Sequence, residues 1–201
     1  MFKQLVLPCA MAVFVASAPS TFAATPDGSF SVRGIGGQTC ADMRTQLAGE
    51  NADVAVAELN GWVAGWLTHA NRSTDDTFDV HPLRSITAIS EIVSRLCAGN
   101  PEALVETVMT LSTTSIASGR VDGTSEIQSY TVGEASFTMR DETMQDLQSA
   151  LVTRELLEEK QADGIFGPAT VSAISAFQKL VELPETGIPD PLTLFLVFTD
   201  Q

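Results

Sequence analysis

Residues 163–170 read Asp-Gly-Ile-Phe-Gly-Pro-Ala-Thr, and this stretch decides the fold of the C-terminal third of the chain. Its two glycines allow backbone angles that other residues avoid, and Pro168 is placed to open a helix, because proline is favoured at the first helical position. Apolar side chains then recur at helical spacing on one face, namely Val171, Ile174, Phe177 and Val181. The stretch therefore predicts a turn that leads into an amphipathic helix.

One further helix is predicted on each side of this turn. Residues 141–154 place Met144, Leu147 and Leu151 on one face, and Asp190-Pro191 is typical of the start of a third helix that carries Leu192, Leu194, Leu196 and Phe198. A unit of about 60 residues has a thin core. We therefore interpret residues 140–201, the C-terminal bundle, as three helices that lean on the rest of the chain. No internal repeat is apparent.

The spacing of these residues is similar to that of a known family. Asp163–Thr170, followed by Ala173-Ile174 and Phe177-Gln178, resembles the peptidoglycan-binding domain of type 1. Leu147-Gln148 resembles the first helix of that family, and the stretch from Leu183 to Leu194 resembles its closing turn and third helix. The resemblance covers about Asp141 to Val197. It implies a three-helix bundle that binds peptidoglycan without catalysing a reaction.

The glycine-rich turn also suggests how such a ligand is held. Backbone N–H groups at a helix N-terminus favour carboxylates, and the stem peptides of peptidoglycan carry carboxylates. The predicted ligand-binding residues are Asp163, Gly164, Phe166, Gly167, Thr170 and Gln178. For Phe166 and Phe177 a position in the core is the favoured alternative, because large aromatic rings gain most from burial. For Gln178 a structural role and a binding role both stay open.

The charge of the chain limits its partners. The formal net charge is -14, and residues 141–201 hold eleven acidic side chains against three basic ones, a net of -8. A chain this negative is repelled by phosphates, which argues against nucleic acid and against attachment to anionic lipid. An anionic wall ligand would have to rely on local N–H groups and a few cations. A bundle that binds a protein instead is the open alternative.

The N-terminus has the layout of a secretory signal peptide over residues 1–24. Lys3 is followed by an apolar run from Leu5 to Ala18 and then by small residues at a cleavage position. The run is shorter than the roughly 20 residues that span a bilayer, so we expect no stable membrane insertion after cleavage. An uncleaved anchor is the alternative.

Cleavage would leave two cysteines, Cys40 and Cys97. An even number in an exported chain favours a disulfide, and two unpaired buried thiols are the alternative.

Residues 25–39, rich in Gly, Ser and Thr, are interpreted as a flexible leader. Residues 120–139 are turn-rich and are interpreted as a linker with at most a short extended segment. The predicted fold class is therefore all-α: a disulfide-stapled helical domain followed by a three-helix bundle.

Residues 40–119, the helical part, are predicted to hold helices at about residues 53–70, at about 82–96, and from Asn100-Pro101 to Gly119. Cys40, Gly61-Trp62, Gly65-Trp66, Phe78-Asp79 and Cys97 resemble the HdeA-type periplasmic helical proteins, which are acid-stress chaperones. The resemblance implies helices stapled by one disulfide. Chaperone activity does not follow from it.

No catalytic constellation stands out in the sequence. Asp75, Asp76, Asp79 and His81 match neither a calcium loop nor a zinc motif, so we interpret them as a solvated acidic loop and predict no metal and no cofactor. No Gly-x-Ser-x-Gly elbow and no fitting triad is present. We predict no catalytic residue.

The sequence thus predicts a non-catalytic periplasmic protein, associated with the cell wall, that binds peptidoglycan through its C-terminal bundle and positions the helical part there. One alternative is a periplasmic chaperone or inhibitor-type module that binds an envelope protein client through the helical part. Another is an accessory subunit of a cell-wall hydrolase.

Overall fold

The computed structural model describes residues 25 and 28–199, so the predicted signal peptide at residues 1–24 lies outside the described residues. By its internal contacts the chain divides into Met1–Ser31 and Val32–Gln201. The described residues of the first division are exposed. Every described helix and strand belongs to the second division.

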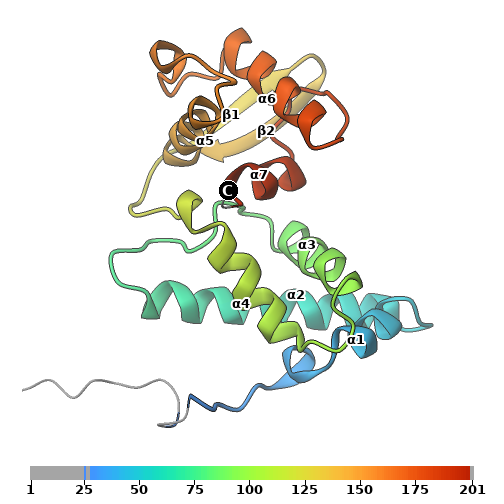
Figure 1. Ribbon diagram of the computed structural model, residues 1–201. Coiled ribbons are helices and arrows are strands. Elements are labelled where there is room, and N and C mark those ends of the chain that lie inside the picture. Colours follow the sequence, from blue (N-terminus) through green and yellow to red (C-terminus); the bar gives the residue numbers. More distant parts are fainter. Residues whose placement is uncertain (1–24, 26–27, 200–201) are drawn as a thin grey trace, which may run out of the picture. The chain divides into compact units, whose positions relative to one another are not determined.

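The helical part contains four α-helices: α1 (Cys40–Leu47), α2 (Ala52–Ser73), α3 (Ile86–Ala98) and α4 (Val105–Ser115) (Figure 1). Short 3₁₀-helices at Gly34–Gly37 and Ala117–Gly119 flank them. Ile35 is fully buried, and a Cβ added at Gly36 would overlap the ring of Trp62. The end of the predicted flexible leader is therefore ordered, because Ile35 enters the core and Trp62 packs over the backbone beside it.

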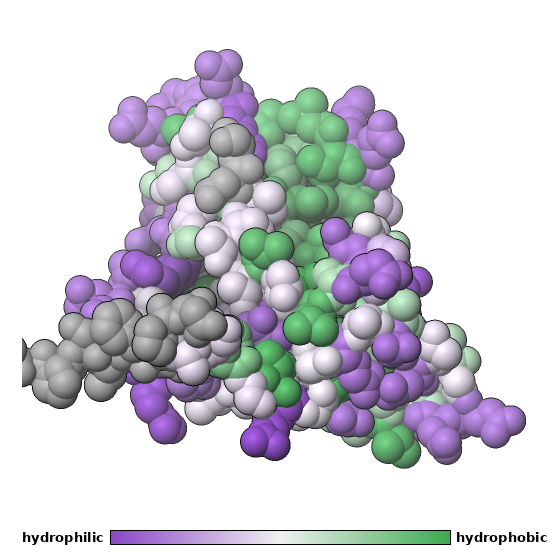
Figure 2. All heavy atoms as spheres, turned by 60° about the horizontal axis from the view of Figure 1, so that its bottom comes forward, coloured by the Kyte–Doolittle hydropathy of each residue, from purple (hydrophilic) through white to green (hydrophobic). Residues whose placement is uncertain are grey.

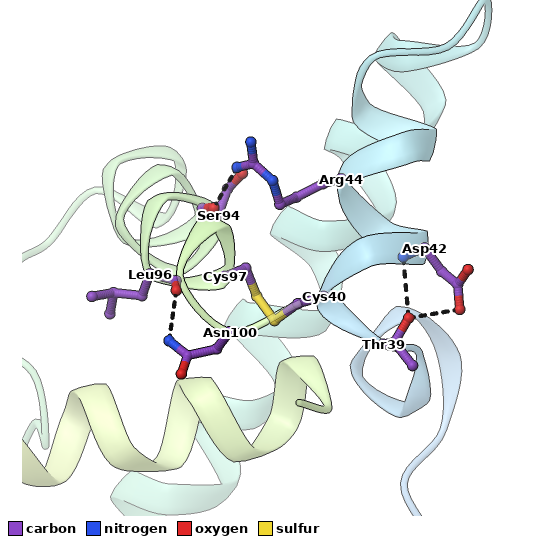
Figure 3. Close-up of a disulfide and its surroundings, with 8 residues drawn as sticks. All are labelled: Thr39, Cys40, Asp42, Arg44, Ser94, Leu96, Cys97 and Asn100. Carbon is purple, nitrogen blue, oxygen red and sulfur yellow. Dashed lines mark hydrogen bonds between the residues drawn. A yellow bond between two sulfur atoms is a disulfide. The ribbon is translucent and has the colours of Figure 1, made fainter. Parts of the chain in front are cut away.

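The predicted disulfide is confirmed. Cys40, the first residue of α1, is bonded to Cys97 in the last turn of α3, with 5.0 Å between their Cα atoms (Figure 3). Both cysteines are fully buried. A guanidinium nitrogen of Arg44 donates a hydrogen bond of 2.9 Å to the carbonyl of Ser94, one turn further along the same pair of helices. The covalent bond and this hydrogen bond together fix α1 against α3.

The start predicted for the third helix of the helical part, which is α4 in the structure, is wrong. Asn100 was expected to cap it, but the Asn100 amide donates to the carbonyl of Leu96 at the end of α3, and α4 begins only at Val105. The intervening residues are held elsewhere, because the carbonyl of Pro101 accepts a hydrogen bond from the N–H of Ala41 in α1. The buried residues of α4 are Val105, Val108, Met109, Ser112 and Thr113.

The all-α prediction also needs correction, because the segment interpreted as a linker contains a β-hairpin. Strands β1 (Ile127–Val132) and β2 (Ala135–Arg140) pair antiparallel, with Val132 opposite Ala135. The two-residue connection begins with Gly133, whose φ of +58° suits a tight hairpin turn. The described residues are thus mostly helical, with a small two-stranded sheet.

The C-terminal bundle contains the three predicted helices, α5 (Asp141–Thr153), α6 (Pro168–Leu180) and α7 (Pro191–Phe198), with a short 3₁₀-helix at Glu159–Gln161. The bundle makes close contact with the end of the helical part. The side chain of Phe198 is 1 % exposed, and a Cβ added at Gly119 would lie 2.7 Å from its ring. The hydroxyl of Ser118 donates to the Phe198 carbonyl at 3.0 Å. These contacts agree with the expectation that a bundle with a thin core leans on the rest of the chain.

The loop interpreted as solvated is partly buried. His81 is 2 % exposed, and its Nδ1 accepts a hydrogen bond from the N–H of Leu83 at 3.1 Å. Burial lowers the pKa of His81 to about 3, so the imidazole is neutral. Asp79 pairs with Val121 through backbone hydrogen bonds, and burial raises the pKa of its carboxyl. Asp75 and Asp76 are exposed, as expected.

Within residues 25 and 28–199, no helix has both the length and the apolar character needed to cross a membrane. This finding concerns the described residues alone.

Removing the disulfide tests its contribution to stability. We expect the double substitution Cys40→Ser and Cys97→Ser to lower the free energy of unfolding by about 2–5 kcal/mol, because the unfolded chain regains the freedom of a long loop. Urea unfolding followed by circular dichroism measures this. Reducing agent should destabilise the wild type to a similar degree and leave the double variant unchanged. A double variant as stable as the oxidised wild type would contradict the expectation.

Candidate functional site

The turn at residues 163–168, here the first turn, is built around one glycine. Gly164 has a φ of +78°, which residues with a side chain rarely adopt, and its N–H donates to Oε1 of Gln148 at 2.7 Å. The carboxylate of Asp163 accepts a hydrogen bond from the N–H of Ile165 at 2.9 Å. The turn thus has a fixed shape before Pro168 opens α6.

A buried glutamine connects this turn to two helices. Gln148, on α5, is fully buried, and its Nε2 donates to the carbonyl of Ile165 at 3.0 Å and to the hydroxyl of Thr170 at 2.9 Å. Its Oε1 accepts from Gly164, so both ends of the amide are used. One side chain therefore holds α5, the first turn and the start of α6 together.

The same arrangement occurs a second time, at residues 186–191, here the second turn. Gly187 has a φ of +68°, and its N–H donates to Oε1 of the fully buried Gln178 on α6 at 2.9 Å. Gln178 Nε2 donates to the carbonyl of Ile188 at 2.8 Å and to the hydroxyl of Thr193 at 3.1 Å. The hydroxyl of Thr186 accepts from the N–H of Ile188, as the Asp163 carboxylate does in the first turn.

The sequence does contain a short repeat, Gly-Ile-x-x-Pro-x-Thr, at residues 164–170 and again at 187–193. In both copies the glycine has a positive φ, the proline opens a helix, and the threonine binds the buried glutamine. The statement that no repeat is apparent was therefore wrong. The repeat is hard to detect in the sequence because only four of its seven positions agree. The two glutamines also lie at different distances before their glycines.

The two copies differ at the position that caps the helix. In the second copy this is Asp190, whose Oδ1 accepts from the N–H groups of Leu192 and Thr193, each at 3.0 Å. In the first copy the equivalent residue is Gly167, and no side chain caps α6. The hydroxyl of Thr193 donates to Asp190 at 2.9 Å, whereas that of Thr170 has a long contact of 3.5 Å to the carbonyl of Ile165. The first copy therefore lacks the carboxylate that completes the second.

The predicted ligand-binding residues thus fall into two groups. Thr170 and Gln178 are 1 % and 0 % exposed and hydrogen-bonded within the bundle, so in this structure they shape the turns. The other four residues form the first turn and its surroundings: Asp163, Gly164, Phe166 and Gly167. Asp163 is exposed, and a Cβ added at Gly167 would meet no atom within 4 Å. Their role as ligand contacts stays a prediction.

The two aromatic residues expected in the core have different positions. Phe177 is 4 % exposed, and the guanidinium of Arg154 lies 5.5 Å from its ring centre. Phe166 is half-buried and packs edge-on against two rings of the hairpin, 5.5 Å from Tyr130 and 5.2 Å from Phe137. This aromatic cluster, defined by Tyr130, Phe137 and Phe166, ties the hairpin to the first turn.

Sequence reasoning did not assign Tyr130 and Phe137 to the site. A partial signal was present, because apolar and polar residues alternate from Tyr130 to Val132 and from Ala135 to Arg140, on the two sides of Gly133-Glu134. Burial raises the pKa of the Tyr130 hydroxyl, and the nearby charge of Asp141 adds to this. Tyr130 is therefore a neutral phenol at physiological pH.

Among residues 25 and 28–199, no three His, Cys, Asp or Glu side chains are grouped so that they could hold a metal ion.

A comparison with known families bears on this site directly. Residues 140–195 match the family model of the peptidoglycan binding domain. This segment is the predicted one to within a few residues, and it contains both turns. No curated protein and no solved structure matches the chain. The match covers the C-terminal bundle and not the helical part.

The importance of the buried glutamines can be tested on Gln178. We expect Gln178→Leu to lower the free energy of unfolding by about 3 kcal/mol, because it leaves the N–H of Gly187 and the carbonyl of Ile188 buried without a partner. Chemical unfolding measures the loss. Gln128→Leu, on an exposed position of β1, is the control and should change stability little. Equal losses of unfolding free energy in the two variants would contradict a structural role of Gln178.

A second test concerns Asp146 on α5. Burial, followed by the charges of Glu142 and Asp122, raises the pKa of this carboxyl to about 6. The folded protein therefore binds a proton between about pH 4 and 6 that the unfolded chain does not, so this group makes stability fall as pH rises through that window.

We expect Asp146→Asn to increase the free energy of unfolding by about 1 kcal/mol at pH 7, a value discounted for the half-exposed position. At pH 4 the gain should vanish, because the carboxyl is then protonated in the folded wild type. Asp75→Asn, in the exposed loop, removes the same charge and is the control. A gain that is the same at both pH values would contradict the assignment.

Proposed function

We propose that the chain is a non-catalytic periplasmic protein that binds peptidoglycan at the first turn of its C-terminal bundle and holds the helical part at the cell wall. The family match of residues 140–195 supports binding to the cell wall. The predicted signal peptide and the disulfide between Cys40 and Cys97 support export, since disulfides persist in oxidising compartments.

One observation supports the first turn as the binding position. The second copy of the repeat places its own carboxylate, from Asp190, on the first N–H groups of α7. The first copy has Gly167 at that position, so the equivalent N–H groups of α6 have no side-chain cap. A carboxylate of a stem peptide would bind there as Asp190 does in the second copy, because helix N-termini stabilise negative charge.

The surroundings of Gly167 suit such a ligand. A Cβ at this residue would have open space around it, and the half-buried ring of Phe166 lies directly before it. The bundle carries a net charge of -8 over residues 141–201, and Lys160, seven positions before Gly167, is paired with Glu158 at 2.6 Å. Binding by a single site of this kind is therefore expected to be weak.

Exposed apolar residues favour a second candidate, a module that binds an envelope protein. Figure 2 shows hydrophobic residues gathered in a patch in the upper part of that view, with hydrophilic residues on either side. In the helical part, Val54 on α2 and Leu111 on α4 are each more than 60 % exposed. Large exposed apolar areas mark interaction surfaces. A client protein bound by the helical part is compatible with attachment of the bundle to the wall.

The binding position can be tested with two substitutions of one residue. Gly167→Asp would supply α6 with the carboxylate that α7 has, so it should raise stability by up to about 1 kcal/mol and compete with the ligand. Gly167→Ala adds a side chain without charge in open space. In co-sedimentation with purified sacculi, we expect the wild type and Gly167→Ala to be retained, and Gly167→Asp to bind about tenfold more weakly.

The outcomes are separable. A wild-type protein that is not retained by sacculi would remove the proposed function. A wild type that is retained together with an equally retained Gly167→Asp would leave wall binding in place and remove the first turn as the carboxylate position.

A further inference from the structure

A groove of about 480 Å³ lies beside the second turn. Its walls are mostly apolar and come from β2, from the second turn and from α7, with Phe137, Met139, Ile188 and Leu194 among them. The remaining lining residues include Arg84 and Ser85, which directly precede α3 in the helical part. The groove therefore combines the matched segment 140–195 with a cation from outside that segment.

Arg84 is held at this groove without a negative partner. One guanidinium nitrogen donates to the hydroxyl of Thr138 on β2 at 3.2 Å, which fixes the side chain beside the groove. The ion pairs of the described residues are Arg120 with Asp122 and Lys160 with Glu158, so Arg84 belongs to neither. In a chain with a net charge of -14, an unneutralised cation beside an apolar groove favours an acidic ligand.

The acidic residue of the groove does not cancel this charge. Asp190 also lines it, but both carboxylate oxygens accept hydrogen bonds from the start of α7: Oδ1 from Leu192 and Thr193, and Oδ2 from the hydroxyl of Thr193. The partial positive charge of the helix N-terminus offsets part of its negative charge. Arg84 keeps its remaining N–H groups for a bidentate contact with a carboxylate.

The groove is connected to the first turn through the aromatic cluster. Phe137 lines the groove and packs edge-on against Phe166 of the first turn, with 5.2 Å between the ring centres. A ligand bound at Gly167 and a ligand in the groove are thus separated by this pair of half-buried rings. Each of the two positions offers donors to a carboxylate, so a peptide with more than one carboxylate is the kind of ligand that could use both.

We propose that this groove binds the peptide stem of peptidoglycan, with Arg84 pairing a stem carboxylate and the apolar walls covering the small side chains of the stem. The proposal rests on the proposed function and extends it, because it makes the helical part a contributor to wall recognition. Arg84 is a binding residue and Thr138 is its positioning residue.

The test compares Arg84, which precedes α3, with Arg95, which lies in α3. Arg84→Gln and Arg95→Gln each remove one exposed positive charge, but Arg95 does not line this groove. In sacculus co-sedimentation with the full chain, we expect Arg84→Gln to bind about five- to tenfold more weakly than wild type, and Arg95→Gln to bind like wild type. Thr138→Val should show a smaller loss in the same direction.

The source of the carboxylate is tested by competition. Soluble stem peptide released from sacculi should displace the wild type, and its inhibition should be weaker for Arg84→Gln. Displacement by glycan fragments without peptide, and not by stem peptide, would overturn the proposal. Unfolding free energies of all variants show whether any loss of binding comes from misfolding.

The failure of this inference is distinct from that of the proposed function. If the wild type is not retained by sacculi, both fall. If the wild type is retained and Arg84→Gln and Arg95→Gln bind equally, wall binding stands and the groove is removed as a site.

Discussion

The architecture of the C-terminal bundle depends on two buried amides, those of Gln148 and Gln178. Each lies on one helix, accepts a hydrogen bond from a glycine N–H in the following turn, and donates to a carbonyl and a threonine hydroxyl beyond it. A turn must keep its backbone polar groups paired even where it is covered, because an unpaired buried group is costly. A glutamine offers a donor and an acceptor at one point, so a single side chain can satisfy both sides of such a turn.

This arrangement explains why Thr170 and Gln178, two of the predicted ligand-binding residues, are buried inside the bundle. Thr170 and Gln178 are required by the turns, since their polar atoms are used inside the bundle. What the turns present outward is backbone, at Gly167 in the first copy. Asp190 in the second copy shows which chemistry suits that backbone, because a carboxylate already occupies it. The difference between glycine and aspartate at one equivalent position separates a helix start without a side-chain cap from one that the chain caps itself.

The helical part and the bundle are in direct contact with each other. Phe198 rests on Gly119, whose lack of a side chain allows the close approach. Arg84, which precedes α3, is hydrogen-bonded to the hairpin that adjoins the bundle. The hairpin itself carries two of the three rings of the aromatic cluster, Tyr130 and Phe137. A segment that the sequence indicates as a linker therefore shapes the surroundings of the first turn and of the groove.

The sequence by itself determined the features that rest on local rules. Gly164 and Pro168 identified the turn and the helix after it, the spacing of apolar residues identified the helices of the bundle, and an even number of cysteines identified the disulfide. Each depends on backbone freedom, on helical periodicity or on counting, all of which are visible over short stretches of chain.

Only the tertiary structure decided features that depend on residues far apart in the chain. The start of α4 at Val105 follows from contacts of the preceding residues with α1, and the burial of His81 follows from the elements packed around it. The short repeat aligns Gly167 with Asp190, and the matching hydrogen bonds of Gln148 and Gln178 give that alignment its structural meaning. The placing of Arg84 beside the second turn joins residues about 100 positions apart, and no local pattern encodes such a meeting, because packing sets it.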